Sequence, residues 1–167
     1  VSIHHFVTIT ENNKPIKMST RKANFTTLQE LCDEVSSEVV RYFFVMRNIN
    51  SHLNFELEIA KDQSDANPIF YLQYAHARIC TILKKAKIEK YDWHDSKYLE
   101  LLVEDKENEL IIKMINFPEI IKTAYKKLDP QIISNYLEEL AANFHKYYGN
   151  YRIITDDKKL SYSRLFL

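Results

Sequence analysis

Glycine is almost missing from this sequence: it occurs once in 167 residues, against a usual share of roughly 7%. Loops that hold phosphate groups on backbone amides need several closely spaced glycines, so the sequence excludes glycine-rich phosphate loops. The same scarcity disfavours a β fold with many tight turns, because glycine supplies the backbone angles that many such turns require. The composition therefore favours long helices.

Cysteines and long apolar runs are also scarce. Cys32 and Cys80 are the two cysteines, and both lie in apolar, helical-looking segments, so we expect buried free thiols and no metal site. No apolar run approaches the roughly 18 residues of a membrane span, and no basic region followed by an apolar stretch opens the chain. We expect a cytoplasmic protein that contacts no membrane.

Charge of one sign is not in excess, because 23 Lys and Arg residues balance 23 Asp and Glu residues. A protein that attracts nucleic acid through its overall field carries a clear positive excess. The sequence therefore excludes bulk electrostatic binding. Any RNA contact must come from a local patch, for which the candidates are Lys84, Lys85, Lys87, Lys90, Lys122, Lys126 and Lys127.

The first third of the chain mixes strand and helix patterns. Thr27 and Glu30 stand three apart ahead of an apolar-periodic run, which predicts a capping box that opens a helix. Leu53, Phe55, Leu57 and Ile59 alternate with polar residues, which predicts a strand or extended connector. The other predicted elements are a strand at residues 3–10, a turn at 11–15, an extended run at 16–18 and a helix at 38–46.

From Asn67 onward nearly the whole chain has helical patterns. Asn67 as N-cap and Pro68 as first helical residue predict a helix that ends near Lys87. Asp129 and Pro130 predict a second long helix, which ends where Gly149 takes the left-handed C′ position. Further helices are expected at residues 96–103, 107–115, 118–127 and 160–167. The expected core faces are Leu72, Ala75, Ile79, Ile82, Leu83 and Ala86, and Ile133, Leu137, Leu140, Ala141, Phe144 and Tyr148.

Residues 17–21 form a basic segment in a polar loop directly after a short extended run. Its sequence is Lys17-Met18-Ser19-Thr20-Arg21. Cationic side chains on such a loop are able to neutralise the charge that builds on a triphosphate during nucleotidyl transfer. An ordinary solvated basic turn is the alternative interpretation, because short motifs recur by chance.

This pentapeptide resembles the KMSKS loop of class I aminoacyl-tRNA synthetases. The segments at residues 60–64, 67–71 and above all Gln73-Tyr74-Ala75-His76-Ala77-Arg78 resemble arginyl-tRNA synthetases in particular. The resemblance is dense over residues 2–85 and looser beyond. It implies a mainly α fold: a small α/β remnant of the class I catalytic domain at residues 1–62, then a helical-bundle anticodon-binding domain at residues 63–167.

The resemblance implies an enzyme that joins arginine to its tRNA with ATP and Mg²⁺. Lys17 and Arg21 would then stabilise the ATP phosphates, within a loop completed by Met18, Ser19 and Thr20. Thr20 replaces the motif's second lysine, as arginyl enzymes commonly show. The nucleotide-binding fold and its HIGH-type signature are not in this chain. We therefore expect a fragment that is inactive alone, binds no ATP by itself and stops before the last helices of its domain.

Tyr74, Arg78, Thr81 and Lys85 form one stripe on the helix that begins at Pro68. An aromatic ring, a planar cation and a phosphate partner on one face suit single-stranded bases. A solvated face whose tyrosine packs on a neighbouring helix is the alternative. The resemblance favours RNA and implies recognition of the central C of arginine anticodons, for which Gln73 and Arg78 are candidates.

Tyr148 is a second aromatic candidate for RNA binding, with Tyr147 beside it, although its spacing also fits the core. His76 and His145 are expected to be structural, hydrogen-bonded histidines. We expect a monomer that binds tRNA and no DNA. Two other interpretations remain: another class I synthetase fragment, which leaves residues 73–78 unexplained, and a helical protein-interaction module, which leaves the loop at residues 17–21 unexplained.

Overall fold

The computed structural model describes residues 5–16, 26–48, 50–94 and 96–167, and the chain divides into two compact units. The first unit holds Val1–Tyr71 and Ile121–Asn135, and the second holds Leu72–Ile120 and Tyr136–Leu167. The loop at residues 17–21 lies outside the described residues. The division into domains after residue 62 stays a prediction.

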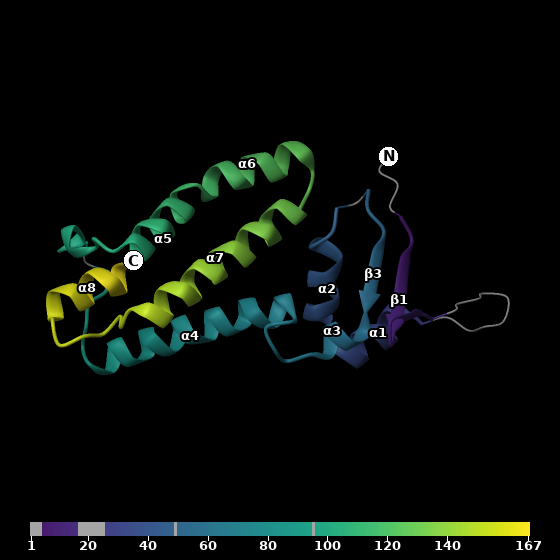
Figure 1. Ribbon diagram of the computed structural model, residues 1–167, viewed down its shortest axis with the longest axis horizontal. Helices are drawn as coiled ribbons and strands as arrows, with labels where there is room; N and C mark the ends of the chain where they lie inside the picture. Colours follow the sequence, from purple (N-terminus) through teal and green to yellow (C-terminus); the bar gives the residue numbers. More distant parts are fainter. Residues whose placement is uncertain (1–4, 17–25, 49, 95) are drawn as a thin grey trace. The chain divides into compact units, whose positions relative to one another are not determined.

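A three-stranded sheet lies in the first unit, with the strand order β2-β1-β3. Figure 1 labels its two longer strands, β1 and β3. Strand β1 (Val7–Glu11) pairs antiparallel with β2 (Lys14–Pro15) and parallel with β3 (Leu53–Glu56). Asn12 and Asn13 form the turn between β1 and β2 at φ angles of 52° and 59°, a region in which asparagine is enriched. The expected strand is present as β1, whereas the expected polar turn is shortened to these two residues, because β2 already begins at Lys14. Residues 17 and 18 of the expected extended run lie outside the described residues.

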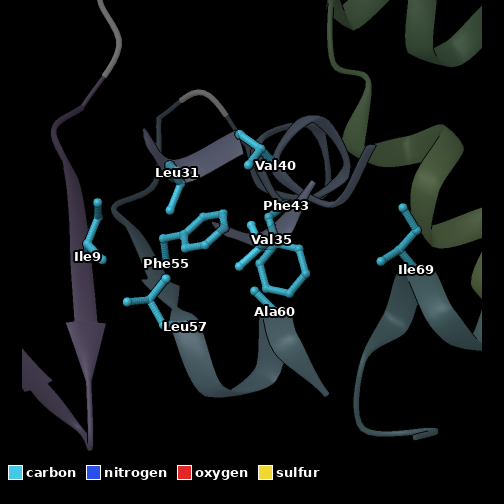
Figure 2. Packing of buried hydrophobic residues seen from close by; sticks show 9 residues of the cluster. All are labelled: Ile9, Leu31, Val35, Val40, Phe43, Phe55, Leu57, Ala60 and Ile69. Atoms are coloured by element: carbon cyan, nitrogen blue, oxygen red, sulfur yellow. The ribbon is translucent and has the colours of Figure 1, made fainter. Parts of the chain in front are cut away.

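Two helices pack on this sheet. Helix α1 (Leu28–Val35) begins with the predicted capping box, in which Thr27 Oγ1 accepts from the Glu30 amide and Glu30 accepts from the Thr27 amide. Helix α2 (Ser37–Val45) follows directly. Phe43 and Phe55 meet at 5.1 Å between ring centroids. Figure 2 shows the whole cluster, which consists of Ile9, Leu31, Val35, Val40, Phe43, Phe55, Leu57, Ala60 and Ile69.

The predicted strand over Leu53 to Ile59 is correct only in its first half. Strand β3 ends at Glu56, and helix α3 (Leu57–Lys61) begins at the next residue. Leu57 and Ala60 are both buried, and their spacing of three places them on one helical face. Because the alternation of apolar and polar residues continues past Glu56, the sequence pattern concealed this change from strand to helix.

Helices dominate the rest of the chain, as predicted. The mainly α fold class with a small α/β part is confirmed. Asn67 is buried and accepts from the Ile69 amide at the start of the first long helix. The elements after it are α4 (Pro68–Ile88), η2 (Leu99–Leu101), α5 (Asp105–Ile115), α6 (Phe117–Lys127), α7 (Gln131–Asn150) and α8 (Lys158–Phe166).

Four of these helices, α4, α5, α7 and α8, line one apolar cavity of about 160 Å³ inside the second unit. An ion pair between buried side chains joins two of them: Arg164 Nε on α8 lies 2.7 Å from Glu107 Oε1 on α5. Tyr136 Oη on α7 donates to the Lys113 carbonyl on α5 at 3.2 Å. Polar contacts thus fix how these helices meet around the apolar interior.

Two helix predictions are wrong. Residues 96–103 form only the single turn η2, because Tyr98 has a left-handed φ of 66° directly before it, which an α-helix does not accept. Gly149 is not a left-handed C′ residue. Helix α7 runs through it to Asn150, and Gly149 does not have a positive φ.

The expected core faces are correct in part. Ala75, Ala86, Ala141 and Phe144 are buried, whereas Ile79 and Leu137 are each 38% exposed. On α7 the buried tyrosine is Tyr147 rather than Tyr148. The helix presents Tyr147 to the interior together with Tyr136, which the predicted stripe did not contain.

Candidate functional site

Helix α4 positions the first candidate side chains. Its N-terminal cap at Asn67 and its first residue Pro68 set where the helix begins. Tyr74, Arg78 and Lys85 follow at helical spacing, so the backbone places them along one side of the helix. Tyr74 and Lys85 are exposed and Arg78 is half-buried. The predicted stripe is therefore accessible along its length.

Arg78 lies between two tyrosine rings from different helices. Its guanidinium carbon is 4.5 Å from the ring centroid of Tyr74 on α4 and 4.6 Å from that of Tyr148 on α7. The Arg78 guanidinium also donates to Tyr74 Oη. A cation over the face of an aromatic ring is attracted by the ring quadrupole. The structure thus brings three predicted site residues, Tyr74, Arg78 and Tyr148, into one cluster.

The rings of this cluster are supported from α7. His145 stacks on Tyr74 at 5.5 Å between centroids with 23° between the planes, and Phe144 stacks on Tyr148 at 5.9 Å with 27°. His145 was expected to be a structural histidine on the helix flank, and its contact with Tyr74 was not foreseen. The signal available in the sequence was its position three residues before Tyr148, which places both on one side of α7.

Arg78 has guanidinium hydrogens available to a ligand. Among the described residues no carboxylate pairs with it, and its hydrogen bond goes to the Tyr74 hydroxyl. A guanidinium has five donors in a plane. The cluster therefore combines aromatic faces with directed cationic donors, the combination that binds unstacked bases by stacking and hydrogen bonding.

Tyr147, the residue before Tyr148, is buried in the interior of the second unit instead. Tyr147 is 2% exposed, and burial raises the pKa of its phenol, with the nearby Glu107 carboxylate adding to the rise. A phenol in such surroundings stays neutral. Of the two consecutive tyrosines on α7, only Tyr148 faces the cluster around Arg78.

The other predicted residues of α4 are less closely associated with the cluster. Lys85 Nζ lies 3.7 Å from Glu89 Oε1 at the surface, and Thr81 Oγ1 donates to the Ala77 carbonyl at 2.9 Å. Gln73 is exposed, and its position one residue before Tyr74 turns it about 100° away around the helix. The structure does not bring Gln73 together with Tyr148.

The two cysteines are free and half-buried, so the expected burial is reached only in part. Cys80 Sγ lies 3.7 Å from His76 Nε2, one helical turn earlier on α4. Among the described residues no group of three or more His, Cys, Asp or Glu side chains is placed to hold a metal ion. None of the described helices is both long and apolar enough to cross a membrane.

Comparison with known proteins relates the chain to an anticodon-binding domain family and to arginine–tRNA ligases. The family described as "DALR anticodon binding domain" matches residues 72–167, the segment that contains the cluster around Arg78. The arginine–tRNA ligases of Salinibacter ruber and Chlorobium limicola are 41% and 44% identical to the whole chain. The chain spans 30% and 31% of these two relatives, or about a third of their length.

Two solved structures also match the chain. A Campylobacter jejuni protein assigned as an arginyl-tRNA synthetase matches 98% of the chain with a TM-score of 0.82 and 27% identity, over 35% of its own length. The arginyl-tRNA synthetase of Thermus thermophilus matches 94% of the chain with a TM-score of 0.65, over 30% of its length. At 21% identity, this second match supports the fold alone.

Proposed function

The chain belongs to the DALR anticodon-binding family, and from this premise we propose that it is the tRNA-recognising, C-terminal part of an arginine–tRNA ligase. The whole protein would join arginine to the 3′ end of its tRNA with ATP and Mg²⁺. This chain would supply recognition of the anticodon. Alone it would not aminoacylate, because its described residues include no nucleotide-binding fold.

The observation that carries the proposal is the placement of Arg78 between Tyr74 and Tyr148. An anticodon loop presents unstacked bases, which proteins bind on aromatic rings and guanidinium planes. Tyr74 and Tyr148 would stack on anticodon bases, and Arg78 would donate hydrogen bonds to the acceptors of the central C. Gln73 would contribute a further hydrogen bond, and Lys85 would bind a phosphate.

The loop at residues 17–21 has a separate role in this proposal. Lys17 and Arg21 would neutralise charge on the ATP phosphates, as part of the segment Lys17-Met18-Ser19-Thr20-Arg21. Neither residue would form a covalent bond with substrate. Other residues of the whole ligase would bind arginine.

We further propose that the protein works in the cytoplasm as a monomer, with tRNA as its macromolecular partner and without DNA or membrane contacts. The equal numbers of acidic and basic residues support the absence of bulk DNA binding. Sedimentation of the chain with and without tRNA tests the stoichiometry. A complex of one chain with one tRNA is expected, and a two-chain complex would contradict it.

Titration of the chain with anticodon stem-loop RNA tests the proposed function. One RNA carries the anticodon of an arginine tRNA, and a second differs only in its central base. We expect the central-base change to weaken binding by about 10- to 100-fold, because the lost hydrogen bonds leave polar groups unpaired. Equal binding of both RNAs, or binding of neither, would contradict the proposed anticodon recognition.

Matched tyrosine variants connect this measurement to the site. Tyr148→Ala removes one stacking surface and should weaken binding of the arginine stem-loop by about 5- to 100-fold, the range of base–aromatic stacking. Tyr125→Ala is the control, because Tyr125 on α6 is 78% exposed and is not part of the cluster. If both variants bind RNA like the unmodified chain, Tyr148 is not a stacking residue.

A further inference from the structure

A second concave site adjoins the cluster around Arg78 in the second unit. Its volume is about 330 Å³, at the lower end of the roughly 300–1,000 Å³ range of small-molecule sites. Its walls come from α4, from α7 and from the segment directly after α7. The lining residues used in the argument are Ile82, Lys85, Tyr148, Tyr151, Arg152 and Ile154.

Tyr148 belongs to both sites. Its ring lies against Arg78 in the first cluster and also lines the second cavity. A base that stacks on Tyr148 therefore lies directly beside the cavity. For a polymer of linked nucleotides, the unit next to the stacked one has this cavity within reach.

The cavity wall after α7 is held in place by buried contacts. Arg164 Nη1 donates to the Arg152 carbonyl at 2.8 Å, and Arg164 is itself paired with the fully buried Glu107. Tyr151 Oη donates to Glu104 Oε2 at 3.0 Å. These bonds fix the backbone at Arg152 and the ring of Tyr151 before any ligand arrives. The site is therefore built in advance, which lowers the entropic cost of binding.

Two basic side chains line this cavity. Lys85 is exposed, with Glu89 3.7 Å away. The Arg152 side chain is exposed, and no described carboxylate pairs with it. Ile82 and Ile154 supply an apolar surface beside these charges. An apolar and aromatic surface next to two cations matches the chemistry of one nucleotide, which has a flat base, a ribose and a charged phosphate.

We propose that this cavity is a second nucleotide subsite, which takes the nucleotide next to the one stacked on Tyr148 and binds its phosphate with Lys85 and Arg152. The inference rests on the proposed anticodon recognition and adds a phosphate-binding role for Arg152. Phosphate contacts position RNA and carry no sequence information. The subsite therefore contributes affinity and register, whereas discrimination of the central base stays with the cluster around Arg78.

Arg152→Gln in the full 167-residue chain tests the subsite, with Lys146→Gln as the matched control. Lys146 is an exposed lysine on α7 that does not line the cavity. Arg152→Gln should weaken binding of the arginine stem-loop on the order of five- to tenfold, and reduce the slope of log K against log salt by about 1. Discrimination against the central-base mutant should be unchanged. Lys146→Gln should stay within about twofold.

Stem-loops with one methylphosphonate, which removes the charge of a single phosphate, locate the contact. At one loop position the substitution should weaken binding to the unmodified chain and have a clearly smaller effect on Arg152→Gln, because that variant has already lost one of the two cations that bind this phosphate. Lys85→Gln should show the same reduced sensitivity at that position. Circular dichroism of each variant checks that the helices remain.

The outcomes separate the subsite from the proposed function. If Arg152→Gln binds like Lys146→Gln, or if every methylphosphonate acts equally on the unmodified chain and on Arg152→Gln, the subsite is wrong even where the central base is still discriminated. If the unmodified chain does not discriminate the central base, the proposed anticodon recognition fails. A loss of discrimination in Arg152→Gln would overturn the phosphate assignment, since it would make Arg152 a base-reading residue.

Discussion

Glu107 and Arg164 are the two charged side chains that the second unit buries together. Glu107 is fully buried and Arg164 is 8% exposed, with 2.7 Å between Oε1 and Nε. Moving a charge out of water is costly, so a buried charge persists only when it is paired and hydrogen-bonded. Arg164 also donates to the Arg152 carbonyl. This pair therefore links the stability of the unit to the geometry of the proposed subsite.

Glu107→Gln should lower the free energy of unfolding by about 3 kcal/mol, because it leaves the Arg164 charge buried without a counter-ion. The amide keeps the size and an acceptor, so the loss reports mainly the charge. Urea unfolding followed by circular dichroism measures it. Glu109→Gln, two residues later on α5, is the control, because its pair with Lys106 lies at the surface. Similar losses for both variants would show that the buried pair has no special role.

Tyr147 and Tyr148 show how far the local environment separates two identical residues. Tyr147 packs inside the second unit, whereas Tyr148 lies beside Arg78. Sequence spacing assigned Tyr148 to the core because it stands four residues after Phe144, within the expected apolar stripe, whereas Tyr147 falls at the edge of that stripe. The choice between them depends on where α4 and α8 meet α7. Such a tertiary contact has no local signal in the sequence.

Helix α7 does not end in the way that the sequence predicts. A C′ residue in the left-handed conformation favours glycine, and Gly149 stands at the expected distance from Asp129. In the structure the residue continues the helix, and apart from its chain neighbours and the local helix backbone no atom lies within 4 Å of where its Cβ would be. Glycine inside a helix lowers stability, because the backbone of a glycine has more conformational entropy in the unfolded state and loses it on folding.

Gly149→Ala should therefore raise the free energy of unfolding by about 0.5–1 kcal/mol. Alanine is the better helix former, and the structure leaves open space for its methyl group. Thermal unfolding of both chains measures the change. If Gly149→Ala instead destabilises the chain, the result would support the left-handed conformation that the sequence pattern predicted, since alanine is strained there.

The capping box of α1 makes its stability depend on pH. Hydrogen bonds from the Thr27 amide and then from the Thr27 hydroxyl hold the pKa of Glu30 below its ordinary value of 4.5. A carboxyl with a lowered folded-state pKa contributes stability above the unfolded value, and loses it as the pH falls through the folded value.

Unfolding of the unmodified chain and of Glu30→Gln should be compared between neutral pH and pH values below 4.5. At neutral pH the unmodified chain should be more stable than Glu30→Gln. This difference in stability between the two chains should shrink as the pH falls and Glu30 becomes protonated. Melting temperatures at each pH measure it. A constant difference across the series would show that the charge of Glu30 does not support the cap.

Local chemistry explains which elements were predictable. The caps at Thr27 and Asn67 depend on residues within three positions, and both appear as expected. The prediction of a helix at residues 96–103 failed because the left-handed Tyr98 interrupts it, while Ser163 Oγ from α8 donates to the Tyr98 carbonyl. That bond joins residues far apart in the sequence, so no local pattern could reveal it.

The candidate site was predictable along one helix but not between helices. The spacing of Tyr74, Arg78 and Lys85 placed them on one side of α4, and the helix is continuous through all three. Arg152 was missed because it follows α7, in a segment without periodicity. Its proposed role depends on Lys85 being close in space, and that proximity depends on how α4 packs near the end of α7.

The charge of the whole molecule limits how it attracts RNA. Lysines and arginines equal aspartates and glutamates in number, and the pI is near 7.2. A neutral protein has little long-range attraction for a polyanion, since screening removes the field of distant charges within about 10 Å at 0.1 M salt. Affinity must then come from close contacts such as the cluster around Arg78 and the pair Lys85 and Arg152.

Salt dependence measures how many phosphates the whole chain neutralises. A protein with 6–10 phosphate contacts loses roughly 10³–10⁵ in affinity between 50 and 200 mM salt. With few local cations engaged, this chain should lose less than about 100-fold for the arginine stem-loop over the same range. Fluorescence anisotropy titrations at four or so salt concentrations give the slope. A loss of a thousandfold or more would mean that a continuous basic surface binds the RNA, and that the stacking cluster contributes little of the affinity.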